Sequence, residues 1–107
     1  MFTIRTHDDA KEEILNLPAV LRGKTIDLIE KLQTVGQLRM PFSKSLGGGL
    51  FELRVIERNN IARTIYVYQH SKTIYLLHAF VKKTQKTPAD ALKTARIRLK
   101  EMIENDD

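Results

Sequence analysis

The stretch LFELRVIERNNIARTIYVYQHSKTIYLLHAFVKKTQK, residues 50–86, decides the fold of this chain. It holds three apolar runs rich in Val, Ile, Tyr and Phe, separated by a polar linker and a tight turn. This pattern is typical of consecutive antiparallel strands. The sequence therefore predicts three central strands, over residues 50–56, 61–68 and 73–83.

Cations within these runs point to an anionic ligand. Because side chains alternate along a strand, Phe51, Leu53 and Val55 share one face, which we expect helices to cover, and Arg54 lies on the other. Basic residues interrupt or follow the three runs at Arg54, Arg63, Lys82, Lys83 and Lys86. A charged side chain is costly to bury without a partner, so these cations predict a ligand, and our hypothesis is RNA.

The flanking segments predict helices. Residues 2–6 alternate as a short strand, and residues 8–17 and 18–35 read as two helices joined at Pro18, the first capped by Asp8 or Asp9. Apolar residues in the second helix recur at spacings of three and four, and Gly36 ends it. Residues 37–49 read as a connector with a mobile glycine turn, and a last helix begins at Pro88.

Composition excludes several classes of protein. The chain has no Cys, and its three His are scattered, so we expect no metal site and no cofactor. No apolar run reaches the roughly 20 residues that span a bilayer, and the N-terminus lacks a secretory signal pattern. We expect a single domain, residues 1–107, in the cytoplasm, without a membrane partner.

Positive charge is concentrated where the predicted strands begin. Residues 44–100 carry twelve Lys and Arg against three Asp and Glu, whereas residues 1–43 carry six of each and residues 101–107 carry four acids. Such a segment attracts polyanions. An ordinary charged surface that keeps a protein soluble has the same composition, so charge alone leaves both interpretations open.

The cations fit metal-free RNA cleavage, in which the 2′-OH attacks the neighbouring phosphorus. Arg54 and Arg63 are suited to stabilising the phosphorane, because a guanidinium binds phosphate oxygens through two N–H groups. Lysines whose pKa is lowered by burial or by neighbouring cations can carry protons, and so can His78. Two alternatives stay open: Arg63 as a structural partner of Glu52, and His78 as a hydrogen-bonded core residue.

Nucleic-acid binding without catalysis fits the pattern equally well. Tyr66, Tyr68 and Tyr75 are able to stack on bases, as in single-strand binders. Four further cations are candidates for RNA binding, although each also fits an ordinary solvated surface: Lys44, Arg58, Lys93 and Arg96.

The motifs PFSKSLGGGLFELRV, ARTIYVY and IYLLHAFVKKTQKTP, followed by a helix, resemble the RelE/ParE superfamily of bacterial toxins. They are most similar to its HigB-like and phage-derived branch, over nearly the whole chain. The resemblance implies an α+β domain, with an antiparallel sheet of about four strands packed on an N-terminal helical hairpin and a C-terminal helix. It also implies an mRNA interferase, an endoribonuclease that enters the ribosome, cleaves mRNA during translation and is silenced by a cognate antitoxin, for which we expect a helix-turn-helix protein.

Matching the motifs residue by residue places the family's basic active-site positions on Arg54, on Arg63 and on the pair Lys82 and Lys83. RelE-like toxins often carry a tyrosine shortly after the last strand, whereas TQKTPADA, residues 84–91, has none. The resemblance therefore leaves two alternatives: Lys86 or His78 transfers the protons, or cleavage depends on electrostatic stabilisation and on ribosomal RNA that orients the substrate. The alternatives are a ParE-like poison of DNA gyrase and a non-catalytic nucleic-acid-binding protein.

Overall fold

Five strands and three helices make up the described part of the chain, residues 1–83 and 86–105 of this computed structural model. In chain order they are β1 (Thr3–Thr6), α1 (Asp8–Leu15), α2 (Ala19–Val35), β2 (Ser43–Gly47), β3 (Leu50–Glu57), β4 (Asn60–Gln69), β5 (Thr73–Lys82) and α3 (Ala89–Asn105). The α+β class expected from the sequence is confirmed. Thr84 and Gln85 of the FVKKTQKTP motif lie outside the described residues.

The sheet has the strand order β1-β5-β4-β3-β2 and is mixed, because β1 pairs with β5 in parallel and the other pairs are antiparallel. The sequence predicted an antiparallel sheet of about four strands. The observed sheet differs at both edges, because β2 is an additional strand at one edge and β1 at the other edge is parallel to its neighbour. The connector expected over residues 37–49 contains the strand β2, whose Ser, Lys and Gly residues give a weak strand pattern. Gly48 and Gly49, with φ of 60° and 86°, form the tight turn between β2 and β3.

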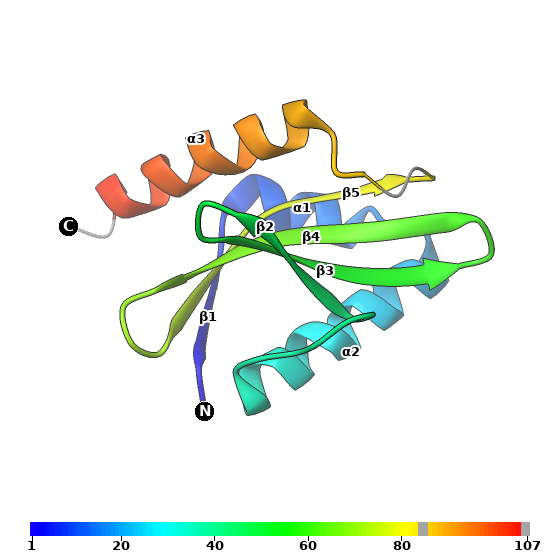
Figure 1. Cartoon of the computed structure of the whole chain (residues 1–107), viewed down its shortest axis with the longest axis horizontal. Helices are drawn as coiled ribbons and strands as arrows, with labels where there is room; N and C mark the ends of the chain where they lie inside the picture. The colour runs from blue at the N-terminus through cyan, green and yellow to red at the C-terminus, as the bar shows by residue number, and fades with distance from the viewer. Residues whose placement is uncertain (84–85, 106–107) are drawn as a thin grey trace.

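Each face of the sheet has its own apolar core. On one face, Leu53 and Val55 of β3 pack with Leu28 and Leu32 of α2, as the alternation in the sequence predicts. On the other face, Leu77 of β5 and other strand residues pack with Ala91, Ala95 and Met102 of α3. Figure 1 shows α3 along one side of the sheet and α2 along the other. The second face is therefore partly covered by α3, rather than left open to a ligand.

The helix ends follow local chemistry. His7, rather than Asp8 or Asp9, caps α1, because its Nδ1 accepts a hydrogen bond from the Asp9 N–H at 3.1 Å. Gly36 ends α2 in the left-handed conformation, as predicted. None of the helices in the described ranges is both long and apolar enough to cross a membrane.

Candidate functional site

Arg54 and Arg63 lie directly opposite each other on β3 and β4. Glu52, two residues before Arg54 and on the same face, places its carboxylate between them. Its Oε2 is 3.5 Å from Arg54 Nε, and its Oε1 is 3.9 Å from Arg63 Nε. The Thr87 hydroxyl donates a hydrogen bond to Glu52 Oε1 at 2.7 Å. Two guanidinium groups therefore share one carboxylate, and the segment leading into α3 closes over it.

Arg63 does not face an open cleft. Its side chain and that of Glu52 are both 0% exposed, and its Nη1 donates a hydrogen bond to the Lys86 carbonyl oxygen at 2.9 Å. Of the two interpretations open from the sequence, the structure has Arg63 paired with Glu52. Burial lowers the pKa of Arg63 below its usual value, the Glu52 carboxylate opposes this shift, and the Arg54 charge adds to it.

Lys82, Lys83 and Lys86 are exposed near the end of β5. Lys83 and Arg58 line a surface hollow of about 450 Å³ together with Ile56, Asn59 and Ile61. Arg54 lines a second hollow of about 450 Å³, whose rim includes Lys24 and Lys31 of α2. This end of the sheet therefore has two neighbouring stretches of surface with cations, one with Arg54, Lys24 and Lys31 and the other with Arg58 and Lys83.

The other RNA-binding candidates lie elsewhere. Lys44 is exposed on the edge strand β2, opposite Glu52 in register, and Lys93 is exposed on α3. Arg96 of α3 lies over the β2–β3 turn, since a Cβ built on Gly48 would be 2.9 Å from Arg96 Nη2. The β2–β3 turn and the β3–β4 turn are at opposite ends of β3, so Arg96 and Arg58 are not brought together.

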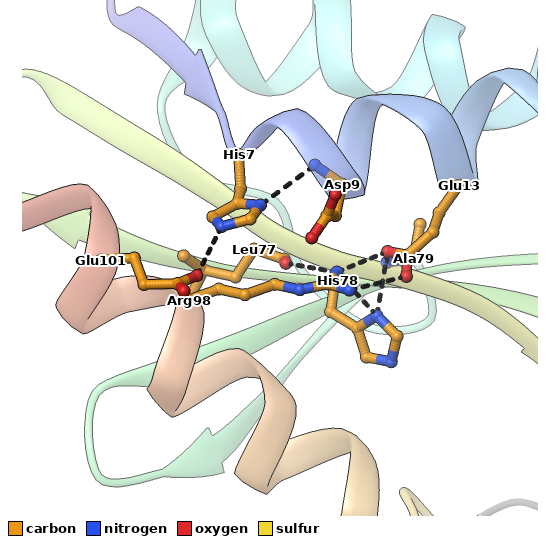
Figure 2. Close-up of polar contacts among 8 residues, drawn as sticks. All are labelled: His7, Asp9, Glu13, Leu77, His78, Ala79, Arg98 and Glu101. Carbon is orange, nitrogen blue, oxygen red and sulfur yellow. Dashed lines mark hydrogen bonds and ion pairs between the residues drawn. The ribbon is translucent and has the colours of Figure 1, made fainter. Parts of the chain in front are cut away.

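His78 is held by hydrogen bonds at the edge of β5. Its Nδ1 lies 3.0 Å from Glu13 Oε1 and 3.2 Å from Arg98 Nη1 (Figure 2). Its ring also stacks on Phe80, with 4.9 Å between the ring centroids. Its side chain is 16% exposed. These contacts favour the interpretation of a hydrogen-bonded, partly buried histidine.

Glu13 of α1 and Arg98 of α3 meet at the same place, which sequence reasoning missed. Arg98 donates to both Glu13 carboxylate oxygens, at 2.7 and 3.0 Å, and to the Leu77 carbonyl oxygen at 3.1 Å. Glu13 also accepts from the Ala79 N–H at 3.0 Å (Figure 2). Burial acts to raise the pKa of Glu13, but the hydrogen bonds from Arg98, Ala79 and His78 outweigh it, so this pKa is lowered.

In the described ranges, no three His, Cys, Asp or Glu side chains are placed to hold a metal ion together.

Comparison with known proteins decides the family. The model of a family described as phage-derived protein Gp49-like matches residues 12–100 of the chain. The chain belongs to this family. The matched residues of this Gp49-like protein include the Arg54–Glu52–Arg63 group as well as Glu13 and Arg98. No curated protein sequence is significantly similar to it.

Solved structures show that this Gp49-like chain has the fold of the E. coli toxin RelE. A mutant RelE in the free state aligns with a TM-score of 0.63 at 12% identity, covering 94% of this chain and 96% of RelE. The isolated RelE toxin aligns with a TM-score of 0.59 at 14% identity, covering 91% and 99% of the two chains. RelE in the intact E. coli RelBE toxin–antitoxin complex gives 0.57 at 15% identity, covering 80% and 100%. The RelE-like fold expected from the sequence is confirmed.

Proposed function

We propose that this Gp49-like protein is the toxin of a type II toxin–antitoxin system and that it is a ribosome-dependent mRNA endonuclease. The observation that carries the proposal is the cross-strand pair Arg54 and Arg63, held around one buried carboxylate on a RelE-like sheet. Exposed lysines at the end of β5 add to this charge. Such a group of cations is suited to a phosphate that gains negative charge in its transition state.

The proposed reaction needs no metal. The RNA 2′-OH loses its proton and forms a bond to the adjacent phosphorus, while the bond to the 5′-oxygen breaks and that oxygen gains a proton. The products are a 2′,3′-cyclic phosphate and a free 5′-OH. The protein supplies positive charge to the phosphorane, and two proton transfers are shared among its basic side chains, the substrate and the ribosome.

Arg63 takes part in this reaction only if its cover opens. The Lys86 carbonyl oxygen, 2.9 Å from Arg63 Nη1, occupies the position that a phosphate oxygen would take. We infer that substrate replaces this carbonyl group when the segment around Lys86 and Thr87 moves. Glu52 keeps Arg54 and Arg63 in place during that exchange, because it is fully buried between them.

The exposed lysines are the better candidates for contact with RNA. Lys82, Lys83 and Lys86 are exposed, whereas the Nδ1 of His78 is held by Glu13 and Arg98. Arg58 shares its hollow with Lys83, and we propose that both contact the RNA backbone. Lys44, Lys93 and Arg96 remain candidates for contacts further from the reacting phosphate.

The proposed partners are an antitoxin, the ribosome and mRNA, all met in the cytoplasm. The E. coli RelBE complex is a toxin–antitoxin assembly of the same fold. A cognate antitoxin for this chain, which we expect to be a helix-turn-helix protein, follows from that likeness.

The test is induced expression of the chain with mapping of mRNA 5′ ends, for the wild type and for Arg63→Lys and Lys83→Ala. Arg63→Lys keeps the charge beside Glu52 but loses the planar fork, and we expect each variant to lower cleavage about 100-fold, as loss of one transition-state donor typically does. Lys72→Ala, in the turn between β4 and β5, is the matched control and keeps full activity. Growth arrest without new mRNA ends would favour the gyrase poison, and RNA binding with neither effect would favour a non-catalytic binding protein.

A further inference from the structure

A hollow of about 740 Å³ lies on the sheet face opposite the arginine pair. Its floor is formed by Phe51 of β3 and by Tyr66 and Tyr68 of β4, and Phe2 lies at one side. Phe51 and Tyr66 are partners in register, as are Arg54 and Arg63, but the two pairs point to opposite faces because side chains alternate along a strand. The hollow is therefore separate from the site proposed for cleavage.

The hollow exists because α2 is too short to cover this part of the sheet. The helix ends at Val35, Gly36 turns the chain away with φ of 80°, and the following segment runs around the rim to β2. Aromatic surface beyond the helix end stays partly exposed at Phe2, Phe51 and Tyr68.

The aromatic floor is rigid. Tyr68 packs edge-on against Phe51 at 5.3 Å and against Phe2 at 6.4 Å, and Phe51 stacks on Tyr66 at 5.6 Å. Hydrogen bonds fix both phenols, between Tyr66 and the Ser43 hydroxyl at 2.6 Å and from Tyr68 to the Gly36 carbonyl oxygen at 2.6 Å. Burial raises the pKa of both tyrosines, so the floor stays uncharged at neutral pH. A preformed floor of this kind takes a planar ring with little cost in ordering.

The rim adds positive charge. Arg39 and Lys44 both line the hollow, and none of its lining residues is acidic. Its volume lies within the range of about 300–1,000 Å³ that is usual for sites of small organic ligands. Aromatic rings beside cations are the combination that binds a base together with its phosphate.

We propose that this hollow binds a single nucleotide unit, with the base packed between the Phe51 and Tyr68 side chains, whose rings are nearly perpendicular, and the phosphate at Arg39. The proposal goes beyond the cleavage function and is tested without it, because binding is measured on the purified chain in the absence of ribosomes. The same chemistry is offered by a free mononucleotide and by one unit of a single-stranded RNA, and separate arms of the experiment distinguish these sources.

The experiment follows backbone amide chemical shifts of the ¹⁵N-labelled chain during titration with AMP, adenosine, inorganic phosphate and a tetra-adenylate RNA. We expect saturable shifts at residues 36–45 and around Phe51 and Tyr68 with AMP, and a weaker response with adenosine or phosphate alone. If the tetranucleotide binds more tightly than AMP at the same amides, the source is an RNA strand. If it binds no more tightly, the source is a free nucleotide.

Three variants locate the site. Phe51→Leu keeps an apolar side chain but removes the ring, and we expect AMP affinity to fall about tenfold, within the effect of losing one base–aromatic stack. Arg39→Ala removes an exposed cation with little risk to the fold and is expected to weaken AMP without changing adenosine. Lys11→Ala, an exposed cation on α1, is the matched control and leaves both affinities unchanged.

Three outcomes would overturn the proposal. The first is no saturable shift up to about 10 mM AMP, well above the millimolar range of weak binding. The second is an identical response to phosphate alone, which would mean that the hollow takes an anion and no base. The third is AMP shifts confined to the Arg54 and Arg63 face, which would place the nucleotide at the cleavage site.

Discussion

Glu52 lies fully buried between the side chains of Arg54 and Arg63, and this carboxylate fixes both guanidinium groups. Three charges in one buried group leave a net charge of +1; the Lys86 carbonyl oxygen accepts a hydrogen bond from Arg63, and the Thr87 hydroxyl donates one to Glu52. A buried ion pair often adds little net stability, but removing one partner leaves the other uncompensated. The group is therefore more sensitive to single substitutions than to paired ones.

Glu52→Leu is expected to lower the free energy of unfolding by about 3–5 kcal/mol, because Arg54 and Arg63 then lie beside each other without the carboxylate that they share. The double variant Glu52→Leu with Arg63→Met removes one of these two cations and is expected to be more stable than the single variant. Urea unfolding of the wild type and both variants, followed by circular dichroism, measures these differences. A double variant less stable than Glu52→Leu would contradict this account of the group.

At the scale of elements, the open edge of β5 is completed by side chains. Pairing between β1 and β5 ends at Thr6 and Leu76, and beyond it Arg98 donates to the Leu77 carbonyl oxygen while Glu13 accepts from the Ala79 N–H. One bidentate ion pair thus replaces two strand-to-strand hydrogen bonds and joins α1, β5 and α3. The part of β5 beyond Leu76, covered in this way, is protected from pairing with another chain.

The hydrogen bonds that the Glu13 carboxylate accepts from Arg98 and Ala79 predict a loss of stability in acid. Because the folded-state pKa of Glu13 lies below its ordinary value of 4.5, the stability it adds is fully present above pH 4.5 and is lost as pH falls through the folded pKa. Glu13→Gln is expected to cost about 1.5–3 kcal/mol at pH 7, the range for hydrogen bonds to charged groups. Thermal unfolding between pH 7 and pH 3 should show the wild type and the variant converging in acid. A constant difference across this range would exclude ionisation of Glu13 as the cause.

Two glycines of the α2 region predict opposite effects of the same substitution. Gly36 has φ of 80°, and a Cβ there would lie 2.1 Å from the Phe2 ring, so Gly36→Ala is expected to destabilise the chain by more than about 1 kcal/mol. Gly23 lies inside α2 with no atom within 4 Å of an added Cβ, so Gly23→Ala is expected to stabilise by about 0.5–1 kcal/mol. Thermal unfolding of both variants measures the two signs, and equal shifts would mean that helix propensity alone decides them.

Local pattern predicted most of the elements, because apolar periodicity marks α2, β3, β4 and β5 directly. It missed β2, whose residues Ser43, Lys44 and Ser45 take part in the sheet through backbone hydrogen bonds that no side-chain pattern reveals. The motif placed Arg54 and Arg63 on consecutive strands, and the register that sets them opposite each other follows from the short turn between β3 and β4. It could not predict their burial or the ion pair between Glu13 and Arg98, because both depend on where α3 lies. The position of a helix is set by contacts between residues that are distant in the sequence.

At the scale of the whole molecule, positive charge is distributed unevenly over the chain. Residues 44–100 carry a large excess of Lys and Arg, and the structure places many of these cations on β3, on the end of β5 and on α3. Charge of this kind attracts a polyanion from a distance and makes its binding dependent on salt. The number of phosphate contacts then follows from how steeply the binding affinity falls as salt rises.

The proposed binding of single-stranded RNA is expected to weaken as salt rises, with a slope in log affinity against log salt that falls by about 0.7 for each phosphate contact removed. Lys83→Ala, beside Arg58 in its hollow, is expected to lower the slope by about this amount. Lys11→Ala on α1 should leave it unchanged. Fluorescence anisotropy at several salt concentrations measures both slopes, and equal losses in the two variants would indicate diffuse attraction without a defined path for the RNA.

The parallel pairing of Thr3 with Thr73 joins the beginning of the chain to its last strand. During synthesis at roughly 5–20 residues per second, the apolar faces of α1 and α2 leave the ribosome before the strands that cover them have been made. The nascent chain therefore cannot complete its sheet until β5 has emerged. The fold that we propose cleaves mRNA therefore cannot form before residues 73–82 have left the ribosome.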